Sequence, residues 1–121
     1  MTALNRNDTH EAGVHYTGYM LAKFGFNNIE TSDESPHVKA QKDGRAYSFH
    51  VTAITDEGAW GGYDNTDFKF SHLVVLTHIL EEPNVYILKA EDVKGLIVLE
   101  KGRYWLNKEK FRNKGKHWNQ I

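Results

Sequence analysis

The segment that decides the fold of this chain is Ser35-Pro36-His37-Val38-Lys39-Ala40-Gln41-Lys42-Asp43-Gly44-Arg45-Ala46-Tyr47-Ser48-Phe49-His50-Val51-Thr52-Ala53-Ile54. An Asp-Gly pair between two alternating runs predicts a β-hairpin with a two-residue loop. Lys42 then pairs with Arg45, and His37 lies opposite His50. Side chains alternate between the faces of a strand, which gives the hairpin an apolar face that would pack on a core. The other face is polar and carries His37, Lys39, Gln41, Ser48, His50 and Thr52.

This hairpin, with the helix expected before it, resembles the PD-(D/E)XK signature of restriction-endonuclease-like and Holliday-junction-resolvase-like nucleases. That signature combines a helix glutamate, a strand starting at Pro-Asp, and a hairpin back to a strand carrying Glu-x-Lys or Gln-x-Lys. Over residues 11–97, Glu11 matches the helix glutamate, Pro36-His37 matches Pro-Asp, and His50-Val51-Thr52 matches the last part. The resemblance implies a restriction-endonuclease-like core.

The departures from the signature fall on the residues that carry the chemistry. In such nucleases the two acids hold a divalent metal and the lysine helps to activate or orient water, but here these positions are His37, His50 and Thr52. Magnesium prefers oxygen ligands, and Glu11 is the one carboxylate left in the frame. Because polarising a phosphate or lowering a water pKa depends on that metal, we expect a catalytically degenerate domain with no cofactor.

The two histidines also allow a metal site of another kind. Directly opposed residues have Cβ atoms roughly 5 Å apart, and imidazole suits zinc, nickel or copper. A third ligand would have to be Glu11 or a residue of the 55–67 loop. The alternative is that the old acidic positions drifted once cleavage was no longer needed. Glu11 likewise has a role without catalysis, in a capping box with Asp8.

Elements along the chain predict an α/β fold, a mixed sheet flanked by helices in the order helix, strand, hairpin, strand, strand, helix. Helices are expected at residues 5–24 and 90–97, with a further helical turn around Trp118. Strands are expected at 26–31, in the hairpin, at 72–77, at 85–89 (antiparallel to 72–77) and at 103–106. The chain of 121 residues has the length of a single domain, 1–121.

Composition excludes several classes of protein. There is no cysteine, so disulfides, zinc ribbons and thiol nucleophiles are ruled out, and no run is long enough to span a membrane. A cytoplasmic protein is therefore the expectation. Net charge is -1 but uneven: residues 1–99 carry 8 − 14 = -6, and the tail 100–121 carries 7 − 2 = +5.

The basic tail indicates a nucleic-acid footprint, in which cations contact phosphates and aromatic rings stack occasionally. Its candidate nucleic-acid-binding residues are Lys101, Arg103, Lys108, Lys110, Arg112, Lys114 and Lys116. The alternative is that the tail aromatics dock on the core while the lysines stay solvated.

A Gly-rich acidic loop at 55–67 carries Trp60 and Tyr63. These two aromatics would either anchor a partner or tuck back onto the sheet. The surrounding acids repel phosphate, which favours a protein partner or a folded lid.

Three functions follow from these observations. The first is a degenerate nuclease-like domain that binds nucleic acid or a protein, as would suit a phage, mobile-element or defence setting. The second is an active metal-dependent endodeoxyribonuclease with migrated residues Glu11, His37, His50 and Lys39, using magnesium, manganese or zinc. The third is a small α/β protein-interaction module unrelated to nucleases. Homodimerisation is compatible with each.

Overall fold

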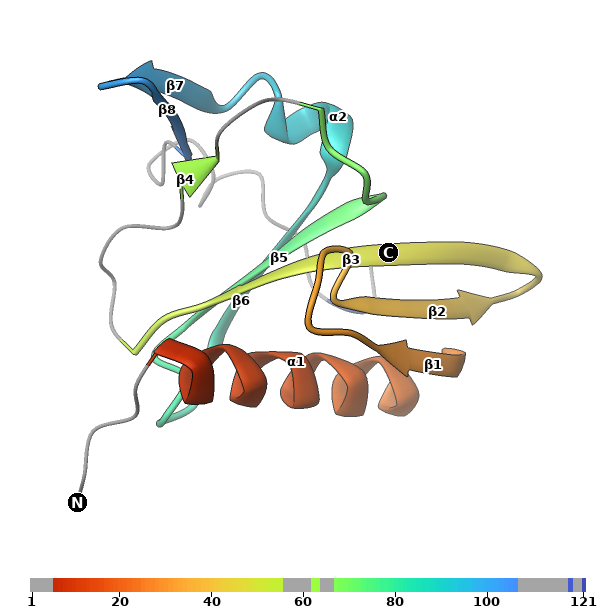
Figure 1. The fold of residues 1–121 in the computed structure, drawn as a ribbon. Coiled ribbons are helices and arrows are strands. Elements are labelled where there is room, and N and C mark those ends of the chain that lie inside the picture. Colours follow the sequence, from red (N-terminus) through yellow and green to blue (C-terminus); the bar gives the residue numbers. More distant parts are fainter. Residues whose placement is uncertain (1–5, 56–61, 64–66, 107–117, 119–120) are drawn as a thin grey trace.

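A five-stranded mixed sheet in the order β1-β2-β3-β5-β6 forms the centre of the computed structural model (Figure 1). Strands β3 and β5 are parallel, and the other neighbours are antiparallel. The structure describes residues 6–55, 62–63, 67–106, 118 and 121. The strands of the sheet are β1 (Asn27–Thr31), β2 (Val38–Lys42), β3 (Arg45–Ala53), β5 (His72–Thr77) and β6 (Asn84–Lys89). The mixed α/β class and the predicted strands are confirmed.

The predicted hairpin forms β2 and β3 in the predicted register, with Lys42 paired to Arg45 and Val38 to Phe49. Asp43 and Gly44 have φ values of 52° and 78°, as a two-residue hairpin turn requires. His37 directly precedes Val38, and His50 directly follows Phe49. Continuing the register by one residue therefore places His37 opposite His50.

Helix α1 (Arg6–Lys23) covers one face of the sheet and packs against β1, β2 and β3 (Figure 1). The predicted helix at 5–24 is therefore confirmed. A Cβ added at Gly13 would lie 2.5 Å from the Cβ of Ala53, so the close approach of helix and sheet requires glycine there. Because α1 begins at Arg6, Asp8 lies inside the first turn and is not the N-cap, so the predicted capping box with Glu11 is wrong. An acid in the first turn still complements the helix dipole.

Two apolar cores lie on opposite faces of the sheet. The first, between α1 and the sheet, contains Val14, Leu21, Phe26, Val38, Ala40, Phe49, Val51, Val74, Leu76, Ile87 and Trp118. The second contains Phe70, Leu73, Val75, Leu88, Val93, Leu96 and Leu106. Strand β5 supplies both cores, and its residues 73–77 are all buried, as a central strand requires.

A second sheet, of three strands, covers the second core. This sheet was not predicted from the sequence. Its order is β4-β8-β7, with β4 (Gly62–Tyr63), β7 (Ile97–Glu100) and β8 (Arg103–Leu106), and it lies on the side away from α1 (Figure 1). The predicted helix at 90–97 is wrong in length, because α2 spans Ala90–Val93 only. Ile97, Val98 and Leu99 pair with β8, and apolar β-formers gain more in a strand than in a helix.

The end of the chain returns to the first core. The Trp118 side chain is 1% exposed, and its ring lies 6.5 Å from that of Tyr16. One tail aromatic therefore docks on the core, while the predicted helical turn around it falls mostly outside the described residues. No helix in the described part of the chain has the length and apolar character needed to cross a membrane.

Candidate functional site

Three histidines from separate elements form a column of rings at one end of the hairpin. His37 lies in the middle: its ring centroid is 4.4 Å from that of His10 in α1 and 4.6 Å from that of His50 in β3. The column continues beyond His50 to Phe70 at 5.1 Å and Tyr63 at 5.7 Å. The rings of His37 and His50 are therefore in direct contact, as the predicted register implies. The ring of His10 lies against His37, and the rings of Phe70 and Tyr63 lie against His50.

The tautomer of His37 follows from a backbone hydrogen bond. Its ring is buried at 8% exposure, and the N–H of Val51 donates to its Nδ1 over 3.0 Å. A neutral imidazole has one accepting and one donating nitrogen, so the proton is on Nε2. Burial, with a smaller contribution from nearby His10, lowers the pKa of His37 to about 4. The ring is therefore neutral at pH 7.

The ring of His50 also has a hydrogen-bond partner, in this case a side-chain hydroxyl. Its Nδ1 lies 2.7 Å from the hydroxyl oxygen of Ser35, within hydrogen-bond distance. Burial is the main cause that lowers its pKa to about 4, and His37 and His10 add to the shift. Two adjacent rings cannot both carry a charge in this setting without a counterion, so both stay neutral at pH 7.

Tyr63 faces inward, as expected if this aromatic residue tucks back onto the sheet. Its ring lies against His50 and 5.3 Å from Phe68, and its hydroxyl is buried. Burial raises the pKa of the Tyr63 hydroxyl to about 12, although the nearby Thr52 side chain partly opposes the shift. No partner among the described residues meets hydrogen-bond geometry with this hydroxyl. Trp60 lies outside the described residues.

The other candidate catalytic residues lie outside this column. Glu11 is exposed on α1, and its carboxylate is 3.6 Å from Nε2 of His15. It shares a surface hollow with His10 and with Asp33 of the turn before β2. Lys39 is exposed on β2 and lines a different hollow, beside Gln41. The structure therefore brings His37 and His50 together, while Glu11 and Lys39 point into separate hollows.

The donor atoms at the column do not fit a divalent metal. Nδ1 of His37 accepts from Val51 and its Nε2 carries a proton, so neither nitrogen offers a lone pair. Nδ1 of His50 is engaged with Ser35, which leaves Nε2 of this ring as the one nitrogen of the pair that could face a metal, and a single nitrogen does not make a site. Within the described residues, no group of three or more His, Cys, Asp or Glu side chains could hold a metal ion. We therefore derive no chemistry through a metal at His37 and His50.

Two of the predicted nucleic-acid-binding residues can be placed. Lys101 and Arg103 are exposed at the turn between β7 and β8 and at the start of β8, and the Arg103 guanidinium lies 5.6 Å from the ring of Trp105. Five others lie outside the described residues: Lys108, Lys110, Arg112, Lys114 and Lys116.

Sequence reasoning missed His10, the α1 residue that contacts the histidine pair. The resemblance to the nuclease signature implies a role for its neighbour Glu11 instead. The buried side of the helix carries Thr9, Gly13, Thr17 and Leu21 at intervals of four residues, but three of these are small or polar, so the sequence signal for that side is weak. His10 follows Thr9 directly and lies at the edge of that side.

Comparisons of this chain with protein-family models, with curated proteins and with solved structures found no match.

Proposed function

We propose that this chain is a catalytically degenerate, nuclease-like domain that binds nucleic acid without cleaving it. The observation that carries the proposal is the hydrogen bond from Val51 N–H to Nδ1 of His37, within the packed column of His10, His37 and His50. In the frame that resembles PD-(D/E)XK nucleases, His37 and His50 stand at the two acidic positions. Neutral, packed rings at those positions can neither bind magnesium nor supply negative charge.

The element order supports the nuclease-like frame. A helix, a strand and a hairpin succeed one another along the chain, and α1 packs against β3, the strand that carries His50 and Thr52. The hairpin register also sets the Pro36-His37 and His50-Thr52 segments opposite each other, as the resemblance implies.

Charge and exposure favour nucleic acid over a protein partner. Residues 100–121 carry a net charge of 7 − 2 = +5, and the two of these cations that can be placed, Lys101 and Arg103, are exposed. The competing protein surface around Trp60 and Tyr63 loses one of its two aromatics, because the Tyr63 ring packs on His50. Cations next to an exposed strand suit contact with a phosphate backbone.

The test is a combined binding and cleavage assay on labelled single-stranded, duplex and branched DNA, with magnesium, manganese or EDTA. We expect retarded complexes that EDTA does not affect, no cleavage, and an affinity that falls as salt rises. A Lys101→Gln/Arg103→Gln variant should weaken binding and lower the salt slope by about one per lost phosphate contact.

Lys94→Gln is the matched control, since Lys94 is exposed and lies outside the basic tail. It should bind as the unchanged protein does. Cleavage that EDTA and Glu11→Gln both abolish would overturn the proposal in favour of an active enzyme. Absence of any complex at low salt would overturn it in favour of an interaction module without nucleic acid.

A further inference from the structure

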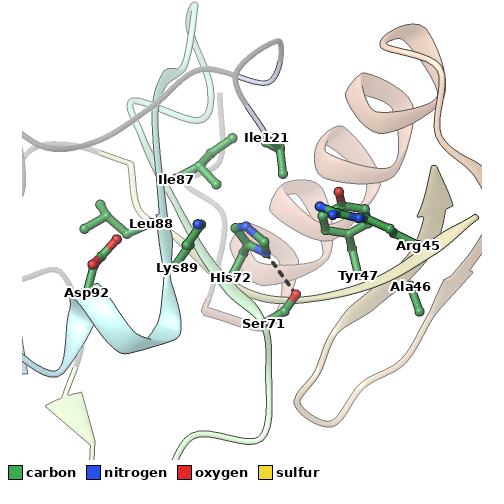
Figure 2. Close-up of a pocket in the computed structure, with 10 residues that line it drawn as sticks. All are labelled: Arg45, Ala46, Tyr47, Ser71, His72, Ile87, Leu88, Lys89, Asp92 and Ile121. Carbon is green, nitrogen blue, oxygen red and sulfur yellow. Dashed lines mark hydrogen bonds between the residues drawn. The ribbon is translucent and has the colours of Figure 1, made fainter. Parts of the chain in front are cut away.

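A cavity of about 500 Å³ lies on the α1 side of the central sheet, over the ends of three strands (Figure 2). It is distinct from the histidine column. Its walls come from the start of β3, the start of β5, the end of β6, Asp92 of α2 and Ile121. Helix α1 packs on β1, β2 and β3, so it leaves this region over β5 and β6 open. The volume falls in the range of sites for small organic ligands.

The floor of the cavity is built from aromatic and aliphatic side chains around His72. The ring of His72 lies 5.6 Å from the ring of Tyr47 and 5.6 Å from that of Phe49. Ile87, on the next strand, is 1% exposed and continues the floor, and Ile121 adds an aliphatic side. Rings and branched side chains of this kind bind the face of a planar group, as tyrosine does for a nucleic-acid base.

The orientation of His72 is fixed by a chain of hydrogen bonds. The hydroxyl of Ser71 donates to the carbonyl oxygen of Ser48 over 2.8 Å. Nδ1 of His72 lies 2.9 Å from the same hydroxyl oxygen. Which of the two atoms donates depends on the tautomer of His72. The ring is thereby held in the floor of the cavity between two strands.

Two cations stand at the rim. Lys89 is the cross-strand neighbour of His72, and Arg45 lies two residues before Tyr47 on the same face of β3. Figure 2 shows His72 between them. Both side chains are exposed, and in the described part of the chain neither takes part in an ion pair. Among the described lining residues, Asp92 is the one acidic side chain, beside the two cations.

We propose that this cavity binds a small organic anion, with a flat apolar body against Tyr47, His72 and Ile87 and a phosphate or carboxylate between Arg45 and Lys89. Tight binding needs both parts of the ligand, because the anionic group contacts the cations at the rim and the planar body contacts the floor. A nucleoside monophosphate has this chemistry and fits the volume. The inference stands on the cavity alone and does not depend on binding of DNA through the basic tail.

The experiment is a titration of ¹⁵N-labelled protein followed by amide shifts, with dissociation constants from calorimetry. The probes are adenosine monophosphate, indole-3-acetate, adenosine and inorganic phosphate. Either anion with a planar body should shift the amides of Ala46, His72 and Leu88 saturably. Adenosine and inorganic phosphate, which each carry half of the required chemistry, should bind at least about tenfold more weakly. The two anions distinguish a phosphate from a carboxylate ligand.

Variants locate the site. Arg45→Gln and Lys89→Gln should each weaken binding by about tenfold, and Tyr47→Leu should do so without changing charge. Lys94→Gln, an exposed lysine that does not line the cavity, is the control and should bind normally. The proposal is overturned by shifts that do not saturate for any probe, by inorganic phosphate binding as tightly as adenosine monophosphate, or by unchanged affinity in Arg45→Gln/Lys89→Gln. Spectra of each variant without ligand verify that it is folded.

Discussion

Acid should destabilise this protein through the histidine column. His37 and His50 have a pKa of about 4 in the folded chain, against an ordinary value of 6.5. Below pH 6.5 the two histidines bind protons in the unfolded chain but stay neutral in the folded chain. The free energy of unfolding therefore decreases as the pH is lowered. The stability that the neutral pair allows is fully present above pH 6.5. It decreases as the pH is lowered from 6.5 to about 4, and the loss is complete below about pH 4.

The size of the effect follows from the same pKa values. Between pH 7.5 and pH 5, a histidine with its pKa shifted from 6.5 to about 4 contributes a loss of about 2 kcal/mol. His50 is only partly buried and the two rings are coupled, so solvent screening reduces the sum. We expect the pair to lose about 2–4 kcal/mol over this range. That is a large part of the stability of a small domain.

Urea unfolding at pH 7.5, 6.5, 5.5 and 5.0, at fixed ionic strength, measures the loss, and proton NMR of the histidine rings gives each pKa directly. The informative variant is His37→Asn/His50→Asn. The amide oxygen of asparagine can take the place of Nδ1 and accept from Val51, while the group does not titrate. This variant should lose less than half as much stability as the unchanged protein over the same interval.

His15→Asn is the matched control, because His15 lies on the exposed side of α1 with a 72% exposed side chain. It should keep the full pH dependence. The reasoning is refuted if the unchanged protein loses less than about 0.5 kcal/mol between pH 7.5 and pH 5, or if the double variant retains the whole loss. Ring pKa values near 6.5 for both histidines would refute it equally.

Two further predictions concern packing. Gly13→Ala should lower the free energy of unfolding by about 1–3 kcal/mol, because the new Cβ meets the Cβ of Ala53 at 2.5 Å, although alanine is the better helix former by about 1 kcal/mol. Urea unfolding checks this, and adding Ala53→Gly should recover most of the loss; a stabilised single variant would contradict it. Tyr63→Phe should leave stability unchanged or raise it by up to about 1 kcal/mol, because it removes a buried hydroxyl that has no hydrogen-bond partner among the described residues. Thermal unfolding measures this, and a loss above about 1.5 kcal/mol would mean that the hydroxyl is bonded to Thr52.

The hairpin could be predicted in full because its signals are local. Asp43-Gly44 determines the turn, alternation determines the faces, and together they set the register that opposes His37 and His50. The buried side of α1 is harder to predict, because Gly13 and two threonines stand where apolar residues usually mark that side. His10 was missed for this reason.

Residues 97–106 form a second hairpin, in which Lys101 and Gly102, with φ values of 51° and 80°, make the two-residue turn. After α2, the sequence continues with Ile97-Val98-Leu99, which is compatible with a buried helix or a strand. Pairing with β8 selects the strand, and β8 in turn pairs with β4 from the loop at 55–67. The hairpin of β7 and β8 has a local signal at Lys101-Gly102, but no local pattern predicts that β4, from a distant part of the sequence, pairs with β8. The cavity at Arg45 and Lys89 has the same origin, since it exists only where the ends of β3, β5 and β6 lie together.

The histidine column links the proposed loss of catalysis to the stability of the hairpin. Two carboxylates at positions 37 and 50 would be costly to bury without a metal ion, because a buried charge needs a compensating partner. Two neutral imidazoles can be buried as aromatic rings, provided that one nitrogen of each is hydrogen-bonded, and Val51 and Ser35 satisfy that condition. Tyr63 can then close over His50 and join the small sheet through β4. In the proposed nuclease-like frame, the same two residues that exclude the metal also allow this end of the hairpin to become part of the core.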